Sequence, residues 1–142
     1  MDILRTQKKN GSRGMVAVEA ALVFPLLILL TFGAIKYGWL FLKVQQITNA
    51  TRYGARLAIL PDATGDEVKT AIINMMTAAN IPVTVDNITI TPADISSLSV
   101  GDSIEVRIII PAEDVDIMDV SIFPSVGNLG ASVTMAKEGF FI

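Results

Sequence analysis

The sequence contains no cysteine and no histidine among its 142 residues. Without cysteine there is no disulfide, no lipid-modified cysteine and no thiolate metal site. Without histidine the chain lacks the commonest general base and a common metal ligand. It also has no glycine-rich phosphate loop after a strand and no nucleophile paired with a base. We therefore expect no catalysis, no cofactor and no metal site.

Basic residues are scarce after Leu60, where three Lys or Arg side chains accompany twelve Asp or Glu. This negative charge argues against binding to nucleic acid, whose phosphates would be repelled. Before the long apolar stretch the charge balance is reversed, because this segment contains four basic residues and only one acidic residue, Asp2. By the positive-inside rule, we expect the N-terminus in the cytoplasm and the acidic part outside. The four basic residues are Arg5, Lys8, Lys9 and Arg13.

Charge is absent from the sixteen residues between Ala20 and Ile35. As a helix this run spans roughly 24 Å, and the flanking turns extend it to the ~30 Å of a bilayer core. The hydrophobic fraction of 51% and the mean hydropathy of +0.55 are high for a soluble domain, and this run accounts for much of both. We interpret it as a membrane span. Glu19 and Pro25 interrupt it in a way that is unusual for a cleaved signal peptide, whereas an uncleaved signal anchor stays open as an alternative.

Glu19 lies in the first turns of the span, where an unpaired carboxylate is costly, so it is a functional candidate that needs a partner. Counted from Met15, directly after Gly14, it is the fifth residue. This arrangement resembles type IV pilin-like precursors, in which a membrane peptidase cuts after the glycine. More narrowly, residues 13–60 resemble the TadE-like pseudopilins of tight-adherence (Tad or Flp) pili. The features that carry this resemblance are Gly14, Glu19, Pro25 and the exit Ala50, Arg52, Tyr53, Gly54, Ala55, Arg56 and Ala58.

The resemblance implies a role for each matching residue. Gly14 and Met15 would flank the bond that a prepilin peptidase cuts, and Glu19 would pair with the N-terminal amine of a neighbouring subunit. Cleavage would create a cation at the depth of Glu19, which can neutralise it. Pro25 would bend the helix and help subunits to pack.

Small residues recur at four-residue spacing along the same stretch and would allow another helix to approach closely. Alanine and glycine are common in membrane helices in any case, so these pairs alone decide little. The two pairs are Ala17 with Ala21 and Ala34 with Gly38, and a further stripe comprises Ala50, Gly54 and Ala58.

We expect one helix from about Met15 to Leu60, ended by Pro61, whose outer half packs on the domain it carries. Its aromatic and basic side chains after Ile35 are typical of an outer membrane interface, with the ammonium groups snorkelling to water. These side chains are Lys36, Tyr37, Trp39 and Lys43. The expected divisions are a basic leader at 1–14, a transmembrane helix at 15–43 and an extracytoplasmic head at 44–142.

The head is predicted to be an α+β domain with one short helix and a three-stranded antiparallel sheet. Thr64 and Glu67 fit a capping box, and the apolar positions Val68, Ile72, Met75, Met76 and Ala79 follow at helical spacing. We expect both methionines of this set to be core residues. Alternation predicts strands at 83–91, 103–110 and 131–137. In the first, the parity of the apolar residues changes, which indicates a bulge near Asp86 and Asn87.

One acidic cluster lies in the long connection after Pro111. It lacks the glycine and the terminal bidentate glutamate of a calcium loop, so we expect a solvated acidic surface. The cluster comprises Glu113, Asp114, Asp116 and Asp119.

Together these features predict a structural pilin-like subunit of the bacterial inner membrane. It would be processed after Gly14 and assembled through its N-terminal helix with other pilins or pseudopilins. The size of the head favours a minor subunit, since the main pilins of such systems are very short. The alternative is an unprocessed single-pass envelope protein whose outer domain binds a ligand or chaperones assembly.

Overall fold

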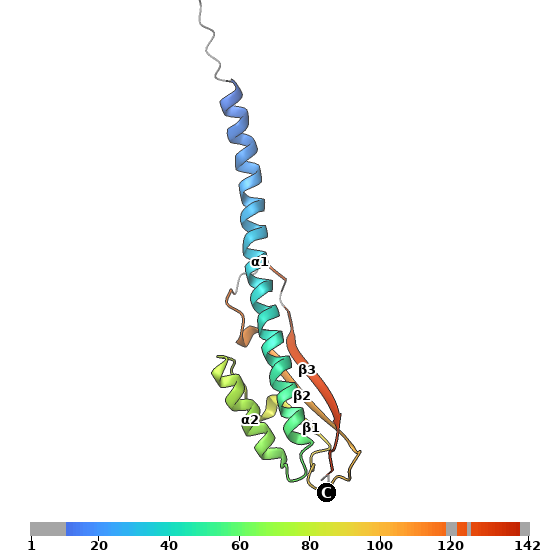
Figure 1. Ribbon diagram of the computed structural model, residues 1–142. Helices are drawn as coiled ribbons and strands as arrows, with labels where there is room; N and C mark the ends of the chain where they lie inside the picture. The colour runs from blue at the N-terminus through green and yellow to red at the C-terminus, as the bar shows by residue number, and fades with distance from the viewer. Residues whose placement is uncertain (1–10, 119–121, 125, 140–142) are drawn as a thin grey trace, which may run out of the picture. The chain divides into compact units, whose positions relative to one another are not determined.

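The computed structural model describes residues 11–118, 122–124 and 126–139, with side chains from Gly14 onward. The predicted leader therefore lies outside the described residues as far as position 10. The elements confirm the predicted α+β class, with a long N-terminal helix, a second helix and a three-stranded antiparallel sheet (Figure 1). In chain order they are α1 (Gly11–Ala58), α2 (Gly65–Ala78), the 3-10 turn η1 (Val85–Asn87), β1 (Ile88–Thr91), β2 (Ser103–Pro111), the 3-10 turn η2 (Ala112–Asp114) and β3 (Asn128–Ala136).

Helix α1 begins four residues before the predicted Met15 and ends two before the predicted Leu60. Its early start is physically reasonable, because a glycine inside a helix costs only about 1 kcal/mol relative to alanine. At its end, the Leu60 amide donates to the Leu57 carbonyl in a tighter turn, and Pro61 disfavours helical geometry at the residue before it. The chain divides into two compact units between Ile35 and Lys36. In the first unit the described residues form only helix; the second unit is the head.

The sheet of the head has the order β1-β2-β3, and β2 pairs antiparallel with both neighbours. Val106 lies opposite Ile90 in β1 and opposite Val133 in β3. The predicted alternation of β2 is confirmed, because every second side chain from Ile104 to Ile110 is fully buried while Arg107 and Ile109 are exposed. One face of the sheet therefore forms the core.

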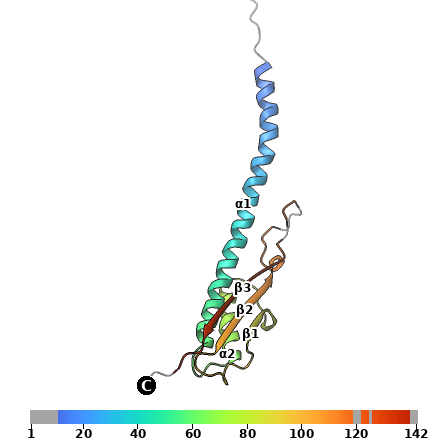
Figure 2. The ribbon, with the colours of Figure 1, turned by 90° about the vertical axis from the view of Figure 1, so that its right-hand side faces the viewer.

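The outer half of α1 and α2 cover that face, which gives the head two layers (Figures 1 and 2). From the helices, Ile47, Ile72 and Met76 are at most 1% exposed and meet the buried row of β2 in one hydrophobic cluster. Each such side chain contributes roughly 1.5–3 kcal/mol by leaving water. The part of α1 beyond Lys36 is thus an integral wall of the core.

Helix α2 begins at the predicted capping box. The Glu67 amide donates to Thr64 Oγ1 at 3.4 Å, and the Thr64 amide donates to Glu67 Oε2 at 3.2 Å. Val68, Ile72 and Met76 are buried in an i, i+4, i+8 stripe. The prediction that Met75 is also a core residue is wrong, since it is 39% exposed. It lies about 100° around the helix from Met76, which takes it off the stripe.

The strand predicted at 83–91 is shorter than expected. Only Ile88–Thr91 is extended, and the predicted bulge near Asp86 and Asn87 is the 3-10 turn η1. The Asn87 Oδ1 atom accepts hydrogen bonds from the amide and the hydroxyl of Thr84, both at 2.9 Å, and holds the turn closed. The change of parity in the sequence did mark an irregularity, but of another kind.

Candidate assembly site on the long helix

From Gly14 to Ile35, α1 exposes nearly every side chain. Its large apolar groups include Leu22 and Leu30, which are 69% and 70% exposed. By length and composition, α1 is the one helix of the described chain that could cross a membrane. A helix that is apolar all round is stable only in lipid or against other apolar helices. This half of α1 is therefore the candidate surface for insertion and assembly.

The predicted cleavage site lies in the first turns of this helix. Gly14 is exposed, and a Cβ added to it would meet nothing within 4 Å. Met15 is 75% exposed. The first four amides of a helix have no acceptor within it, so opening the first turn costs few hydrogen bonds. The rest of the described chain therefore leaves Gly14 and Met15 uncovered.

Glu19, the predicted assembly residue, is exposed on α1. Among the side chains described from Gly14 onward, the ion pairs are Lys36 with Asp116 and Arg107 with Glu105, so Glu19 takes no part in one. Its carboxylate is available to a partner from outside this part of the chain.

Pro25 lies inside α1, and the helix continues through it. Because proline has no amide hydrogen, the carbonyl of Ala21 loses its usual donor four residues later. The predicted close-packing residues Ala17, Ala21 and Ala34 of this half are exposed, and so is Gly38, which lies just after it.

The second group of small residues serves a different purpose, because Ala50, Gly54 and Ala58 are buried within the head. A Cβ at Gly54 would lie 2.7 Å from Ile72 Cγ1, so the missing side chain is what lets α1 approach α2. The small residues predicted for helix packing therefore fall into an exposed set, from Ala17 to Gly38, and a set already buried inside the head.

Sequence reasoning missed the role of Lys36. Instead of snorkelling to water, its side chain is 4% exposed, and Nζ lies 2.9 Å from Asp116 Oδ2. The same ammonium donates to the Met118 carbonyl at 3.1 Å and lies 5.9 Å from the centre of the Phe123 ring. The pair ties α1 to the connection between β2 and β3.

Two further side chains of α1 behave in the same way. Trp39 Nε1 donates to the Val115 carbonyl at 2.8 Å, and Lys43 Nζ donates to the Ala79 carbonyl at 3.0 Å. Lys43 also stacks on the Trp39 ring at 4.8 Å, and its side chain is buried. These groups, expected at a membrane interface, fasten the helix to the end of α2 and to the loop after β2.

Asp116 is not part of a solvated surface, in contrast to the prediction. Partial burial by itself raises the pKa of its carboxyl, but hydrogen bonds from Lys36 and the Met118 amide, with the charge of Lys36, outweigh this and lower the pKa below its usual value. Glu113 and Asp114 are exposed as expected, and Asp119 lies outside the described residues. Within the described chain, no three acidic side chains are arranged to hold a metal ion.

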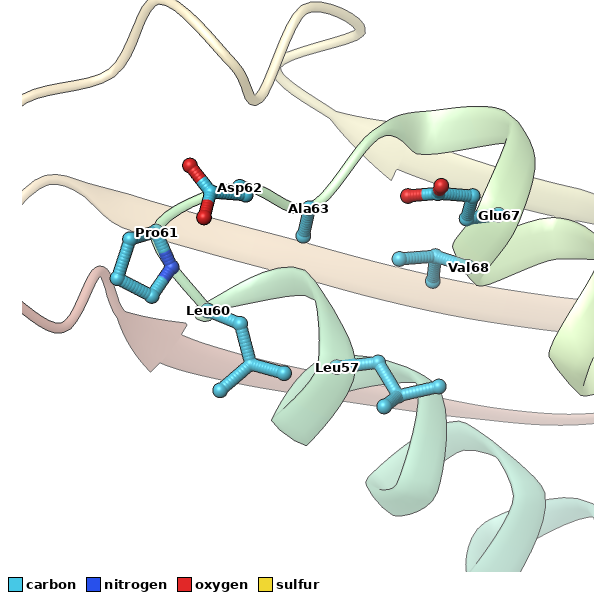
Figure 3. Close-up of a pocket in the computed structure, with 7 residues that line it drawn as sticks. All are labelled: Leu57, Leu60, Pro61, Asp62, Ala63, Glu67 and Val68. Carbon is cyan, nitrogen blue, oxygen red and sulfur yellow. The ribbon is translucent and has the colours of Figure 1, made fainter.

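A small hollow lies where α1 turns into α2 (Figure 3). It has a volume of about 390 Å³, and its wall is mostly aliphatic, with Glu67 already engaged in the capping box. The hollow offers no nucleophile and no cation. The residues that line it are Leu57, Leu60, Pro61, Asp62, Ala63, Glu67 and Val68.

The fold and the exposed helix define a class: a protein with one N-terminal helix able to span a membrane and a small α+β head that includes the end of that helix. Residues 14–56 match the family model of TadE-like proteins, which confirms the predicted resemblance. This is a structural family associated with pili, and the match indicates involvement in Tad pilus assembly. No curated protein and no solved structure matches the chain.

Proposed function

We propose that the chain is a pilin-like subunit of a Tad-type pilus or secretion assembly, cut after Gly14 and assembled through the exposed half of α1. The observation that carries this proposal is the isolated carboxylate of Glu19 on an uncovered apolar helix within the TadE-like match. An unpaired carboxylate in lipid costs several kcal/mol, so it persists there only with a partner. The N-terminal amine of a neighbouring processed subunit supplies a cation at the same depth.

The protein is inserted in the inner membrane with its N-terminus in the cytoplasm. The four basic residues before the span and the twelve acidic residues after Leu60 support this orientation. The head lies outside the cytoplasm and presents the sheet face that the helices leave open. Its partners are the membrane, other pilins or pseudopilins, and a prepilin peptidase.

Mass spectrometry of the protein purified from its native membrane tests the processing step. We expect a mature chain that begins at Met15, with an N-methylated amine if the peptidase also methylates it. A Gly14→Val variant serves as the control and should retain the leader. Recovery of the native protein with Met1 intact would contradict processing and favour the unprocessed envelope protein.

Co-purification of other pilins tests the role of Glu19. Glu19→Ala and Glu19→Gln should insert normally but recover partner pilins roughly tenfold less well, the effect of losing about 1.4 kcal/mol. Glu113→Gln, which neutralises an exposed carboxylate on the head, is the matched control and should leave recovery unchanged. Equal recovery with all variants would remove Glu19 from assembly.

A further inference from the structure

The connection between β2 and β3 is held to the first turns of α1 that follow Ile35. Lys36 Nζ and Trp39 Nε1 donate to the carbonyls of Met118 and Val115, and Tyr37 Oη donates to the carbonyl of Pro124 at 3.4 Å. All of these contacts lie within the unit that begins at Lys36. The connection lies at the opposite end of the sheet from the C-terminal end of α1 (Figure 1). These three hydrogen bonds therefore fix the position of the connection along α1.

This connection exposes large apolar side chains. Ile117 is 48% exposed, Ile122 is 69% exposed and Val126 is 38% exposed; these three residues are called the loop patch below. Phe123 beside them is half-buried under the Lys36 ammonium. Three exposed aliphatic groups on one connection between strands point to a surface that is covered in the working protein.

The charges around the loop patch narrow the kind of partner. Residues 115–127 contain no Lys or Arg, so nothing in this segment attracts phosphate groups or an acidic protein. Asp116 is neutralised by Lys36, and Asp119 lies outside the described residues. Glu113 and Asp114 are exposed at the start of the connection, where they favour water. The partner is therefore apolar where it meets the loop patch and does not depend on ionic attraction.

The depth of the loop patch relative to the bilayer indicates what this apolar partner is. A helix from Met15 to Ile35 spans roughly 30 Å, the thickness of a bilayer core. Lys36, Tyr37 and Trp39 follow within one turn, in the interfacial layer that is roughly 5–8 Å deep and favours tyrosine and tryptophan. The loop hydrogen-bonded to these residues lies at the same depth.

We propose that Ile117, Ile122 and Val126 insert into the interfacial layer of the outer leaflet, so that this connection attaches the head to lipid. This inference rests on the membrane insertion of α1 given under the proposed function. Before assembly, the loop patch would hold the head against the bilayer. The binding energy is hydrophobic and does not require anionic lipid.

Single introduced cysteines can test the docking, because the chain has no native cysteine that would also be labelled. Full-length variants Ile122→Cys, Val100→Cys and Leu27→Cys are labelled with an environment-sensitive fluorophore and reconstituted in phosphatidylcholine vesicles containing brominated acyl chains. Val100 is 71% exposed on the loop before β2 and is the matched control, and Leu27 reports on the span. Iodide in the buffer serves as the aqueous quencher.

We expect brominated lipid to quench the labels at 27 and 122, with quenching at 122 roughly twofold stronger than at 100, since only groups within the bilayer reach the bromines. Iodide should quench the label at 100 and spare the label at 122. If lipid quenches 27 but iodide quenches 122 and 100 equally, the docking is overturned while the span stands. If neither quencher reaches 122, the loop patch is covered by the chain itself or by a second copy of it, which also overturns the lipid assignment. Absence of lipid quenching at 27 would overturn the membrane insertion itself.

Discussion

Lys36 illustrates how the meaning of a residue depends on what folds onto it. In the sequence it is a cation at the end of an apolar run, which is typical of a snorkelling side chain. In the fold it is buried and bound to Asp116 and to a backbone carbonyl. A buried ammonium is tolerated only with such partners, because an unpaired charge costs several kcal/mol. The residue is a fastening between helix and loop.

This fastening predicts a pH-dependent effect of Asp116→Asn. The folded-state pKa of Asp116 is lowered from 3.8, so its stabilising contribution is complete above that value and is lost as the pH falls through the lower folded-state pKa. At pH 7 the variant leaves Lys36 buried without its counter-ion and should lose about 1–3 kcal/mol of unfolding free energy. As the pH falls through this lowered pKa, the difference from the parent should shrink. Thermal unfolding followed by Trp39 fluorescence measures both.

Asp114→Asn is the matched control, because this neighbouring carboxylate is exposed and forms no described ion pair. It should leave the unfolding temperature unchanged at pH 7. A loss of stability in Asp116→Asn that does not shrink as the solution is acidified would contradict the role of the ion pair.

At the scale of elements, helix α1 has two parts with different surroundings. Its side chains are mostly exposed before Lys36, and many are buried in the head after it. Before Lys36 the small residues Ala17, Ala21 and Ala34 are exposed, whereas Gly54 is in close contact with Ile72 of α2. The same four-residue spacing thus leaves small residues exposed in one stretch of α1 and packs them inside the head in another. Sequence spacing alone cannot separate these uses.

Substitution of the two glycines should separate them. Gly54→Leu forces Ile72 away from its position and should destabilise the head by about 1–3 kcal/mol, the usual cost of overpacking. A Cβ added at Gly38 meets nothing within 4 Å, so Gly38→Leu should leave unfolding of the head unchanged. Urea unfolding in detergent, followed by circular dichroism, compares the two. Equal stabilities would mean that α1 and α2 are less closely packed at Gly54 than the geometry requires.

Elements governed by local patterns were predictable from the sequence. The alternation of β2 and the capping box at Thr64 depend on residues within a few positions of each other, and both are confirmed. The strand at 83–91 was predicted too long, because Asn87 closes a 3-10 turn with Thr84 that competes with the extended backbone. Predictions from periodicity fail where a polar side chain forms hydrogen bonds with a nearby backbone amide, because such bonds can favour a turn over a strand.

At the scale of the whole molecule, contacts between distant parts of the chain were beyond prediction. Lys36 and Met118 are separated by 82 residues, and no spacing rule links them. The candidate assembly residues, by contrast, lie in one continuous stretch that the TadE-like match covers. The location of the site was therefore readable in the sequence, whereas the anchoring of the head to the helix was not.

Because α1 forms part of the core, it limits how the head can be exchanged, in evolution or by engineering. Leu40, Ile47 and Ala50 belong to the same hydrophobic cluster as the sheet, so the head has no independent beginning after the helix. A soluble derivative or a chimaera with another anchor would have to be spliced ahead of Lys36. A different head cannot be joined as a separate module at Leu60. A change in the part of α1 after Lys36 must be matched by changes in the strands that pack on it.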